Sequence, residues 1–344
     1  MCKEIERGEC MARSIMGLEI GSSNIKIIEV VKKGITLDVQ KFSLLDTPID
    51  AINNGVISNI EPIRKVIAEE LKLKRYNAKQ VVVIVQSSNI IIRNAIMDKQ
   101  PEKVIRQLLE IRTEDYLPVE RGQYQIDFKI TDEYEENGVV KNKLVLVAAP
   151  NTVVLPVAAL VKSLKLTPIL ISIPSEALGY VFNANSRMIY EGIKHVMVLD
   201  IGGKSTTATI VSEEESILTR IIDFGVEHIN EIINESGVAQ KIQGEAEEDY
   251  LSGIIRPEIE YNIVSEVERI LQFYYSSYST GVVKKIYLTG GGANIKGIRG
   301  YIRDALNIPT EKLSRFDTVT DSKGIEFDDY ARFFVNILGA INGL

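Results

Sequence analysis

Hydrophobic and polar positions along the chain form one plan that occurs twice. In each half, a short apolar run ends at an acidic residue and a glycine, and two further runs of strand length follow it, as in a meander of strands. Segments with apolar residues at helical spacing come after each meander. We therefore predict a duplicated α/β architecture with one sheet in each half.

The first half contains additional predicted elements. Four strands around one helix suggest a small subdomain with its own sheet, and the run Val81–Val85 is apolar throughout, as in a strand buried on both faces. We predict strands Ile15–Ile20, Asn24–Val31 and Ile35–Leu44, helix Pro62–Lys72, strands Val81–Val85 and Ile90–Met97, helix Pro101–Tyr116, strands Gln123–Thr131 and Lys143–Ala149 around an acidic turn Asp132–Gly138, helix Val153–Leu164, strand Ile169–Ile173 and helix Ser175–Asn183.

The second half repeats the meander. Its segment Ser236–Gly253 is rich in Glu and Gly and is predicted to be mobile and solvated, and the polar residues 1–14 are predicted to be a disordered leader. The other predicted elements are strands Val196–Leu199, Thr206–Ser212 and Ile217–Ile222, helix Asp223–Asn234, a long helix Pro257–Ser279, strand Ile286–Leu288, and helices Ile298–Leu306 and Tyr330–Ala340.

Two glycine turns carry the candidate chemistry. Leu18-Glu19-Ile20-Gly21 recurs as Leu199-Asp200-Ile201-Gly202, each time before a run of small, polar and basic residues. Glycine has no Cβ, so backbone N–H groups in such a turn can approach an anion, and two facing turns can hold one phosphate chain. Lys26 and Lys204 either contact phosphates or are solvated surface lysines.

A third glycine element follows another short strand. Leu288-Thr289-Gly290-Gly291-Gly292-Ala293-Asn294 offers a flat surface without side chains for a larger group. The three elements together predict two phosphate sites and a nucleoside site.

Other familiar nucleotide and catalytic motifs do not fit. Gly203-Lys204-Ser205 resembles the end of a P-loop, but Val198 stands where that loop needs glycine. A dinucleotide fingerprint beginning at Gly290 fails at Ile295. His195 and His228 have no Ser or Cys elbow, so a nucleophilic triad has no support.

Composition narrows the class of protein. The chain has 344 residues, enough for two domains, and a net charge of −7, which gives no overall positive field for nucleic acid or an anionic membrane. The cysteines, Cys2 and Cys10, make neither a disulfide framework nor a zinc motif, as expected in a reducing cytoplasm. We find neither a secretory signal nor a membrane span in the sequence, so a partner is expected to mediate any contact with a membrane.

The chain resembles the actin-like ATPase superfamily, and within it the PilM family of cytoplasmic type IV pilus assembly proteins, with the FtsA division proteins next. The resemblance covers about residues 15–344 and rests on Gly17–Lys26 as first phosphate loop, Leu199–Thr206 as second, and Ile286–Ala293 as nucleoside motif. An insert near residues 79–157 lies where these two families carry an extra subdomain. The resemblance implies a first lobe of residues 15–78 and 158–190 with a closing helix at 330–344, the insert 79–157, and a second lobe of residues 191–329.

The resemblance also implies ATP and Mg²⁺ as ligands. Glu19 and Asp200 would hold the metal through water, and Glu247 would contact the nucleoside. The remaining implied binding residues are Gly21, Ser22, Ser23, Asn24, Lys26, Gly202, Gly203, Lys204, Ser205, Thr206, Gly290, Gly291, Gly292 and Ala293.

This chain departs from the family pattern at several positions. The family usually has Asp where this chain has Glu19, so the reach of the carboxylate toward a metal changes. A usual double glycine is replaced by Gly225-Val226, and the following Thr by Asn230. The family signature Ala-Glu-x-x-Lys resembles Ala246–Tyr250 without the lysine, which is expected to weaken nucleoside binding.

Three functions remain open. The first is a nucleotide-switched scaffold, peripheral to the inner membrane, that binds the cytosolic N-terminal peptide of a PilN-like membrane protein and is at most a slow ATPase. The second is a small-molecule kinase of the same fold, for which we find no further acidic signature. The third is an FtsA-like polymer, which needs a basic amphipathic C-terminal helix. That helix is not expected here, because the closing helix ends at Asn342-Gly343-Leu344. Pilus motor components and a second copy of the chain are further possible partners of the scaffold.

Overall fold

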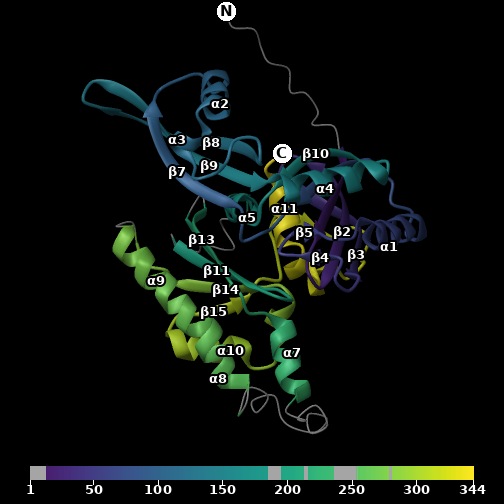
Figure 1. Ribbon diagram of the computed structural model, residues 1–344. Helices are drawn as coiled ribbons and strands as arrows, with labels where there is room; N and C mark the ends of the chain where they lie inside the picture. Colours follow the sequence, from purple (N-terminus) through teal and green to yellow (C-terminus); the bar gives the residue numbers. More distant parts are fainter. Residues whose placement is uncertain (1–12, 185–194, 213–215, 236–252, 254, 279–280) are drawn as a thin grey trace, which may run out of the picture.

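The computed structural model describes residues 13–184, 195–212, 216–235, 253, 255–278 and 281–344. Residues 1–12 of the expected leader lie outside the described residues. So do residues 236–252 of the expected mobile segment Ser236–Gly253. The strands form a large sheet in each half of the chain, together with a three-stranded sheet and a two-stranded ribbon (Figure 1).

The first large sheet has the strand order β10-β6-β1-β2-β3-β16. Strands β1, β2 and β3 form an antiparallel meander, and β6 and β10 extend the sheet parallel to β1. The bounds are β1 Arg13–Ile20, β2 Asn24–Lys33, β3 Thr36–Asp46, β6 Gln80–Ile84, β10 Thr167–Ser172 and β16 Val319–Thr320, with β4 Ile52–Asn53 and β5 Val56–Ile57 in the ribbon.

The second large sheet has the order β13-β12-β11-β14-β15 and repeats the directions of the first. Strands β11, β12 and β13 form the meander, and β14 and β15 are parallel to β11. The predicted duplication of the meander is therefore confirmed. The bounds are β11 His195–Ile201, β12 Thr206–Ser212, β13 Ser216–Ile222, β14 Lys285–Thr289 and β15 Thr310–Lys312.

Two helices, α5 (Pro174–Ala184) and α11 (Val335–Asn342), share one buried core with residues of both large sheets. Glycines allow α11 to pack this closely. A Cβ added to Gly17 of β1 would lie 1.9 Å from Ile337, and one added to Gly339 would lie 2.1 Å from the carbonyl oxygen of Ala177. The closing helix thus connects the two halves.

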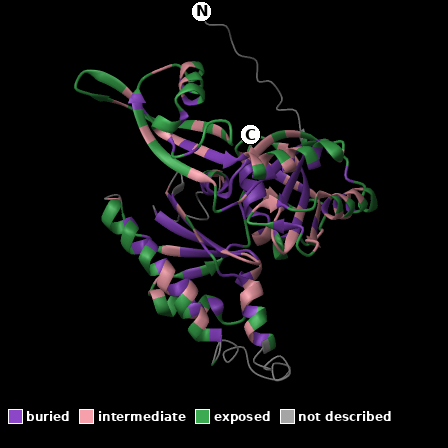
Figure 2. Ribbon diagram, in the orientation of Figure 1, coloured by how far each residue is buried: buried purple, intermediate pink, exposed green. Residues whose placement is uncertain are grey.

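The other helices cover the outer faces of the large sheets, and Figure 2 shows buried strands beneath helices with exposed outer surfaces. Helices α1 and α4 share a core with the first sheet, and α7, α9 and α10 share one with the second. Asn59 begins α1 by accepting a hydrogen bond from the backbone N–H of Glu61. The bounds are α1 Ile60–Leu73, α4 Asn151–Ser163, α7 Val226–Glu235, α8 Ile255–Ile259, α9 Ser265–Ser277 and α10 Ile298–Leu306.

Two helices predicted as continuous are interrupted. The prediction Pro101–Tyr116 becomes α2 (Glu102–Ile111) and α3 (Thr113–Tyr116), because the Thr113 hydroxyl bonds the carbonyl of Leu109 and competes with the helix ladder. The prediction Pro257–Ser279 becomes α8 and α9 joined by one π-helical turn. The closing helix begins at Val335 rather than Tyr330, after a short 3₁₀ turn.

The small sheet has the order β7-β9-β8, with α2 packed on one face. Its strands are β7 Ile91–Asp98, β8 Tyr124–Glu136 and β9 Val139–Pro150. The expectation that Val81–Val85 belongs to this sheet was wrong, because β6 pairs with β1 and β10 in the first large sheet. The predicted turn Asp132–Gly138 was also too long, since β8 continues to Glu136 and only Asn137 and Gly138, both at positive φ, make the hairpin.

Candidate functional site

A cleft of about 870 Å³ lies where the first strands of the two large sheets end. Both glycine turns and the first two glycines of the triple-glycine element line it, although they are far apart in sequence. Six carboxylates and two lysines also line it: Glu19, Asp46, Asp50, Asp200, Asp223, Glu227, Lys26 and Lys204. The cleft therefore combines backbone turns, cations and acids on both sides.

The two glycine turns have the same geometry. The N–H of Gly21 donates to the carbonyl of Asn24 at 2.9 Å, and the N–H of Gly202 donates to the carbonyl of Ser205 at 2.9 Å. Each glycine N–H is thus used within its own turn, so an anion would have to be bound by the residues that follow each glycine.

Polar contacts join the two sides of the cleft. The Ser23 hydroxyl donates to Glu227 at 2.5 Å, and the backbone N–H of Lys204 donates to the Ser22 hydroxyl at 3.3 Å. A Cβ added to Gly203 would lie 1.6 Å from the Ser23 hydroxyl, so only glycine allows this approach. In this arrangement, the two serine hydroxyls are bonded to the opposite side of the cleft.

An ion pair lies on the first-sheet side of the cleft. Lys26 contacts Glu19 at 2.7 Å across the β1–β2 pair, and both residues are largely buried. Burial raises the pKa of Glu19 above its ordinary value despite the Lys26 ammonium, and the charge of Asp200 raises it further. Burial alone would lower the pKa of Lys26, but the carboxylates of Glu19 and Asp200 outweigh burial and raise it. Lys26 is therefore a cation held between two acids and not a solvated surface lysine.

The acids at the ends of β1 and β11 form a pair served by α11. Asn336 of α11 lies 3.5 Å from the Asp200 carboxylate, and its amide also favours the charged form of Glu19. The Oε2 atom of Glu19 is buried and has no hydrogen-bond partner among the described residues. A buried acceptor without a partner fits a water of a phosphate-bound metal.

Direct coordination of a metal by protein side chains has less support than a metal held through water. The described part of the chain contains no group of three or more His, Cys, Asp or Glu side chains that could hold a metal ion. Mg²⁺ keeps several waters and commonly takes its remaining ligands from phosphates. The residues present thus fit a metal held through water, as the sequence implied for Glu19 and Asp200.

The glycines of the triple-glycine element have different environments. Gly290 has a φ of 75°, and an added Cβ would lie 2.3 Å from the Asp200 carboxylate. A Cβ on Gly292 would lie 2.2 Å from Ile201, whereas one on Gly291 meets only Phe333, at 3.8 Å. Gly290 and Gly292 are therefore required by packing, and Gly291 presents the open surface.

The structure brings most implied residues together in the cleft, and four are not among them. Thr206 is fully buried and bonds the carbonyl of Phe224, while its neighbour Thr207 lines the cleft. Gly292 and Ala293 are buried, and Ala293 packs in the core of the second lobe. Glu247 lies outside the described residues. The implied residues that line the cleft are Glu19, Gly21, Ser22, Ser23, Asn24, Lys26, Asp200, Gly202, Gly203, Lys204, Ser205, Gly290 and Gly291.

Sequence reasoning missed several residues of the cleft. Gln86, just after β6, donates to the Thr207 hydroxyl at 2.5 Å across the cleft. Glu227 and Phe333 also line the cleft, and Asn336 contacts its acids. Only Glu227 had a local signal, since it follows the Gly225 that replaces the family's double glycine.

None of the helices in the described ranges combines the length and apolar character needed to cross a membrane.

Comparisons with known proteins identify the family and the fold of this chain. The sequence profile of the family described as type IV pilus assembly protein PilM matches residues 17–341. The structure is similar to the solved PilM–PilN type IV pilus biogenesis complex, with a TM-score of 0.80 and 21% identity over 96% of this chain and 98% of that chain.

More distant structures share the fold. The ethanolamine utilization protein EutJ from Carboxydothermus hydrogenoformans has a TM-score of 0.53 and 13% identity, over 97% of this chain and 90% of that one. A Bacteroides thetaiotaomicron protein with an actin-like ATPase fold has a TM-score of 0.51 and 9% identity, over 96% of each chain. The predicted actin-like α/β fold is thereby confirmed. Because the family profile spans almost the whole sequence, this chain belongs to the PilM family of type IV pilus assembly proteins.

Proposed function

We propose that this protein is an ATP-binding scaffold of a type IV pilus assembly platform and that it holds the cytosolic N-terminal peptide of a PilN-like inner-membrane protein. The observation that carries the nucleotide part is the pair of identical glycine turns facing each other across one cleft, each preceded by a carboxylate. The cytoplasm, at the inner membrane, is the compartment in which such a scaffold would act.

In this proposal the phosphates of ATP bind between Ser22–Lys26 and Gly203–Ser205. Lys26 supplies positive charge, and Glu19 and Asp200 orient waters on a phosphate-bound Mg²⁺. The open surface at Gly291 receives the nucleoside. When bound, the metal would neutralise phosphate charge next to these two acids.

We further propose that the two lobes move relative to each other with nucleotide. The contacts Ser23–Glu227, Ser22–Lys204 and Gln86–Thr207 close the cleft, and phosphates would compete for the same hydroxyls. A ligand that binds one lobe arrangement more tightly shifts the population toward it. This mechanism would link the nucleotide to the peptide surface.

The domain division follows the sheets in this proposal. Residues 15–78 and 158–190 with 330–344 form the first lobe, and residues 191–329 form the second. Strands β6 and β16 and helix α4 are assigned to the first lobe as well, because β6 and α4 share its core and β16 pairs with β3 in its sheet. The insert is then the three-stranded unit at residues 91–150.

The insert offers the candidate peptide surface. Helix α2 covers one face of its sheet, and Ile92 and Ile96 of edge strand β7 remain 41% and 55% exposed. Val147, opposite Ile92, packs toward the first lobe, so this apolar strip lies at the junction of insert and lobe. An edge strand beside apolar side chains suits an extended apolar peptide, because the main chain can bond the edge while side chains fill the strip.

The test is titration of the protein with the N-terminal peptide of the neighbouring PilN-like membrane protein, with and without ATP and Mg²⁺. Ile92→Asp/Ile96→Asp should eliminate peptide capture, because the charges cannot be buried against an apolar peptide. Val139→Asp/Val140→Asp is the matched control, since these residues are 45% and 42% exposed at the hairpin of the same subdomain.

Equal capture by the β7 variant and its control would move the peptide site to another surface. A peptide affinity that is identical with and without ATP would contradict the proposed coupling.

A further inference from the structure

We propose that the first lobe carries a membrane-facing surface, made by the ends of α1 and α4, that binds anionic lipid headgroups directly. We call it the basic end and define it by Lys72, Lys74, Arg75, Lys79, Lys162 and Lys165. All six side chains are exposed. Residues 71–80 and 160–169 contain these six cations and no acidic residue, in a chain whose net charge is −7.

The fold brings the two segments together. Helices α1 and α4 share a core, and each leads directly into a parallel strand, β6 or β10. The backbone N–H of Thr167 donates to the carbonyl of Lys79 at 2.8 Å, which joins the two linkers side by side. Cations from segments about ninety positions apart therefore lie on one surface.

Both helices end in the same motif, with a cation at its strained position. In α1, the N–H groups of Arg75 and Tyr76 bond the carbonyls of Lys72 and Leu71, and α4 repeats this pattern at Lys165 and Leu166. This is the Schellman motif, whose left-handed position usually holds glycine.

The left-handed residues here are Arg75, with a φ of 52°, and Lys165, with a φ of 59°. A residue with a Cβ is strained in this conformation, and attraction to the helix dipole offsets only part of that strain. At the ends of both helices, a cationic residue thus occupies a left-handed position where glycine would be less strained.

Few of these charges are neutralised by the protein itself. Lys74 pairs with the buried Glu70 at 3.3 Å. Within the residues that the structure covers, the other five cations have no ion-pair partner. The exposed acids of α1, Glu61 and Glu69, precede its last turn. A field of one sign at this surface favours an anionic ligand.

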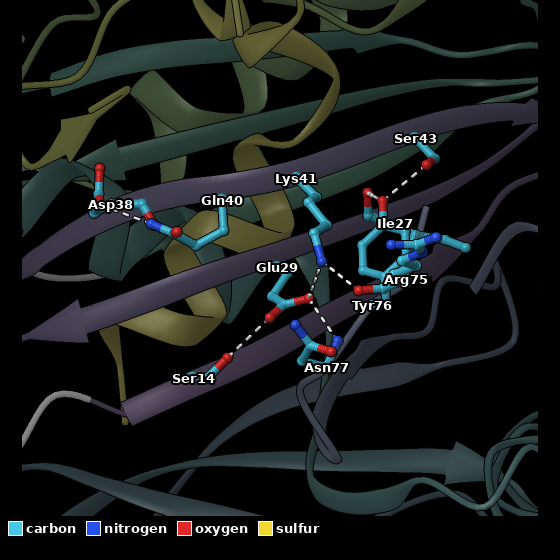
Figure 3. A network of polar contacts seen from close by, with 10 residues as sticks. All are labelled: Ser14, Ile27, Glu29, Asp38, Gln40, Lys41, Ser43, Arg75, Tyr76 and Asn77. Carbon is cyan, nitrogen blue, oxygen red and sulfur yellow. Dashed lines mark hydrogen bonds and ion pairs between the residues drawn. The ribbon is translucent and has the colours of Figure 1, made fainter. Parts of the chain in front are cut away.

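A polar network around the buried Glu29 fixes the linker that carries the cations (Figure 3). Glu29 accepts hydrogen bonds from the backbone N–H of Asn77 at 2.9 Å and from the Ser14 hydroxyl at 3.1 Å. Lys41 lies 3.8 Å from the same carboxylate and donates to the carbonyl of Arg75. The surface above this network is therefore held in place before any ligand binds.

The chemistry favours a lipid surface over an acidic protein. Leu73 is 77% exposed between Lys72 and Lys74, so an apolar side chain projects among the cations. Apolar groups that enter the headgroup region and cations that attract anionic lipids act together at a bilayer.

The position of the basic end relative to the cleft suits membrane binding. The basic end lies where β6 and β10 begin, whereas the cleft lies where the parallel strand β1 ends. The eight residues of β1 span about 26 Å, so the cleft remains open when this end faces a bilayer.

The test is sedimentation of the full chain with vesicles of phosphatidylcholine with or without phosphatidylglycerol. We expect binding that requires phosphatidylglycerol and falls as salt rises from about 0.1 M to about 1 M, where the Debye length shrinks from about 10 Å to about 3 Å. Lys72→Gln/Lys79→Gln/Lys162→Gln should weaken binding about 100-fold, since each cation contributes about fivefold. The matched control, Lys284→Gln/Lys296→Gln/Arg299→Gln, removes three exposed cations of the second lobe and should bind as wild type.

A second variant separates binding from folding. Arg75→Gly/Lys165→Gly relieves two left-handed residues, so its melting temperature should equal or exceed that of wild type while vesicle binding falls about 30-fold. The proposal would be overturned if the control triple variant lost as much vesicle binding as the basic-end triple variant. Unchanged vesicle binding in either basic-end variant would also overturn it. Absence of wild-type binding at low salt would also overturn it and would leave an acidic protein as the better occupant.

Discussion

The carboxylates that end β1 and β11 differ by one methylene group, and they have different partners. Glu19 reaches across to Lys26, whereas Asp200 contacts the amide of Asn336. The local repeat of acid, Ile and Gly made both carboxylates predictable from sequence. Gln86 and Asn336 were not predictable, because they reach the site from segments 121 and 136 positions away from their partners. Glu227, which lies 204 positions from Ser23, had only its place after Gly225 as a signal.

Removal of the second carboxylate should weaken metal-dependent nucleotide binding. Asp200→Ala is expected to lower the affinity for a fluorescent ATP analogue about 10–100-fold in Mg²⁺, because a phosphate-bound metal loses a group that orients its water. The measurement is a titration with and without Mg²⁺. Asp223→Ala, an exposed acid of the same cleft, is the control. Unchanged affinity in the Asp200 variant would remove this acid from the proposed metal site.

A side chain at Gly291 should block the nucleoside without unfolding the protein. Gly291→Val adds atoms on the open surface of the cleft, so adenosine nucleotides should bind about tenfold more weakly or worse. Gly300→Val in α10 meets no atom within 4 Å and serves as the matched control. Normal binding by the Gly291 variant would make the triple glycine purely structural.

At the scale of elements, the local sequence pattern identified the strands themselves better than it identified which strands pair with each other. The apolar run of β6 correctly indicated burial on both faces, but it carried no information on which sheet buries it. Parallel pairing with β1 and β10 joins segments far apart in sequence, whereas the hairpins of both meanders are local and were predicted. The same limit applies to β16, a short strand that pairs with β3.

One carboxylate attaches this late strand to the first sheet. Asp38 accepts hydrogen bonds from the Ser322 N–H at 3.0 Å, the Ser322 hydroxyl at 2.7 Å and the Thr320 hydroxyl at 3.1 Å. Burial alone would raise the pKa of Asp38, but these bonds outweigh burial and lower it. Asp38→Ala should therefore reduce the free energy of unfolding by about 1–3 kcal/mol at neutral pH.

The effect should depend on pH in a defined direction. Because the folded-state pKa is lowered, the stabilisation by Asp38 is present above the unfolded value of about 3.9 and is lost as pH falls through the folded value. Denaturant unfolding of wild type and variant at neutral pH and near pH 3 measures this. The exposed neighbour Asp317→Ala should show neither effect. A difference that stays constant on acidification would show that the charge of Asp38 is not the cause.

At the scale of the whole molecule, the two lobes contact each other directly, because the serines of the first turn meet the Lys204 backbone and Glu227 of α7. A nucleotide switch needs states that persist, so we expect steady-state ATP hydrolysis below about 1 per second, the lower end of the usual enzyme range. Phosphate release with saturating ATP and Mg²⁺, with and without sugar or acid acceptors, measures it. Faster turnover that depends on an acceptor would favour a small-molecule kinase.

The position of α11 has a consequence for how the protein is made. Residues of α11 complete the core shared by both sheets, and β16 completes the edge of the first sheet, although both follow the whole second meander in the sequence. During synthesis the first lobe therefore lacks its last helix until the second lobe has been translated. Its apolar face is open to chaperones over that interval. A chain truncated after residue 334 should be cut by protease in its first lobe at sites that are protected in the full chain, because it lacks α11.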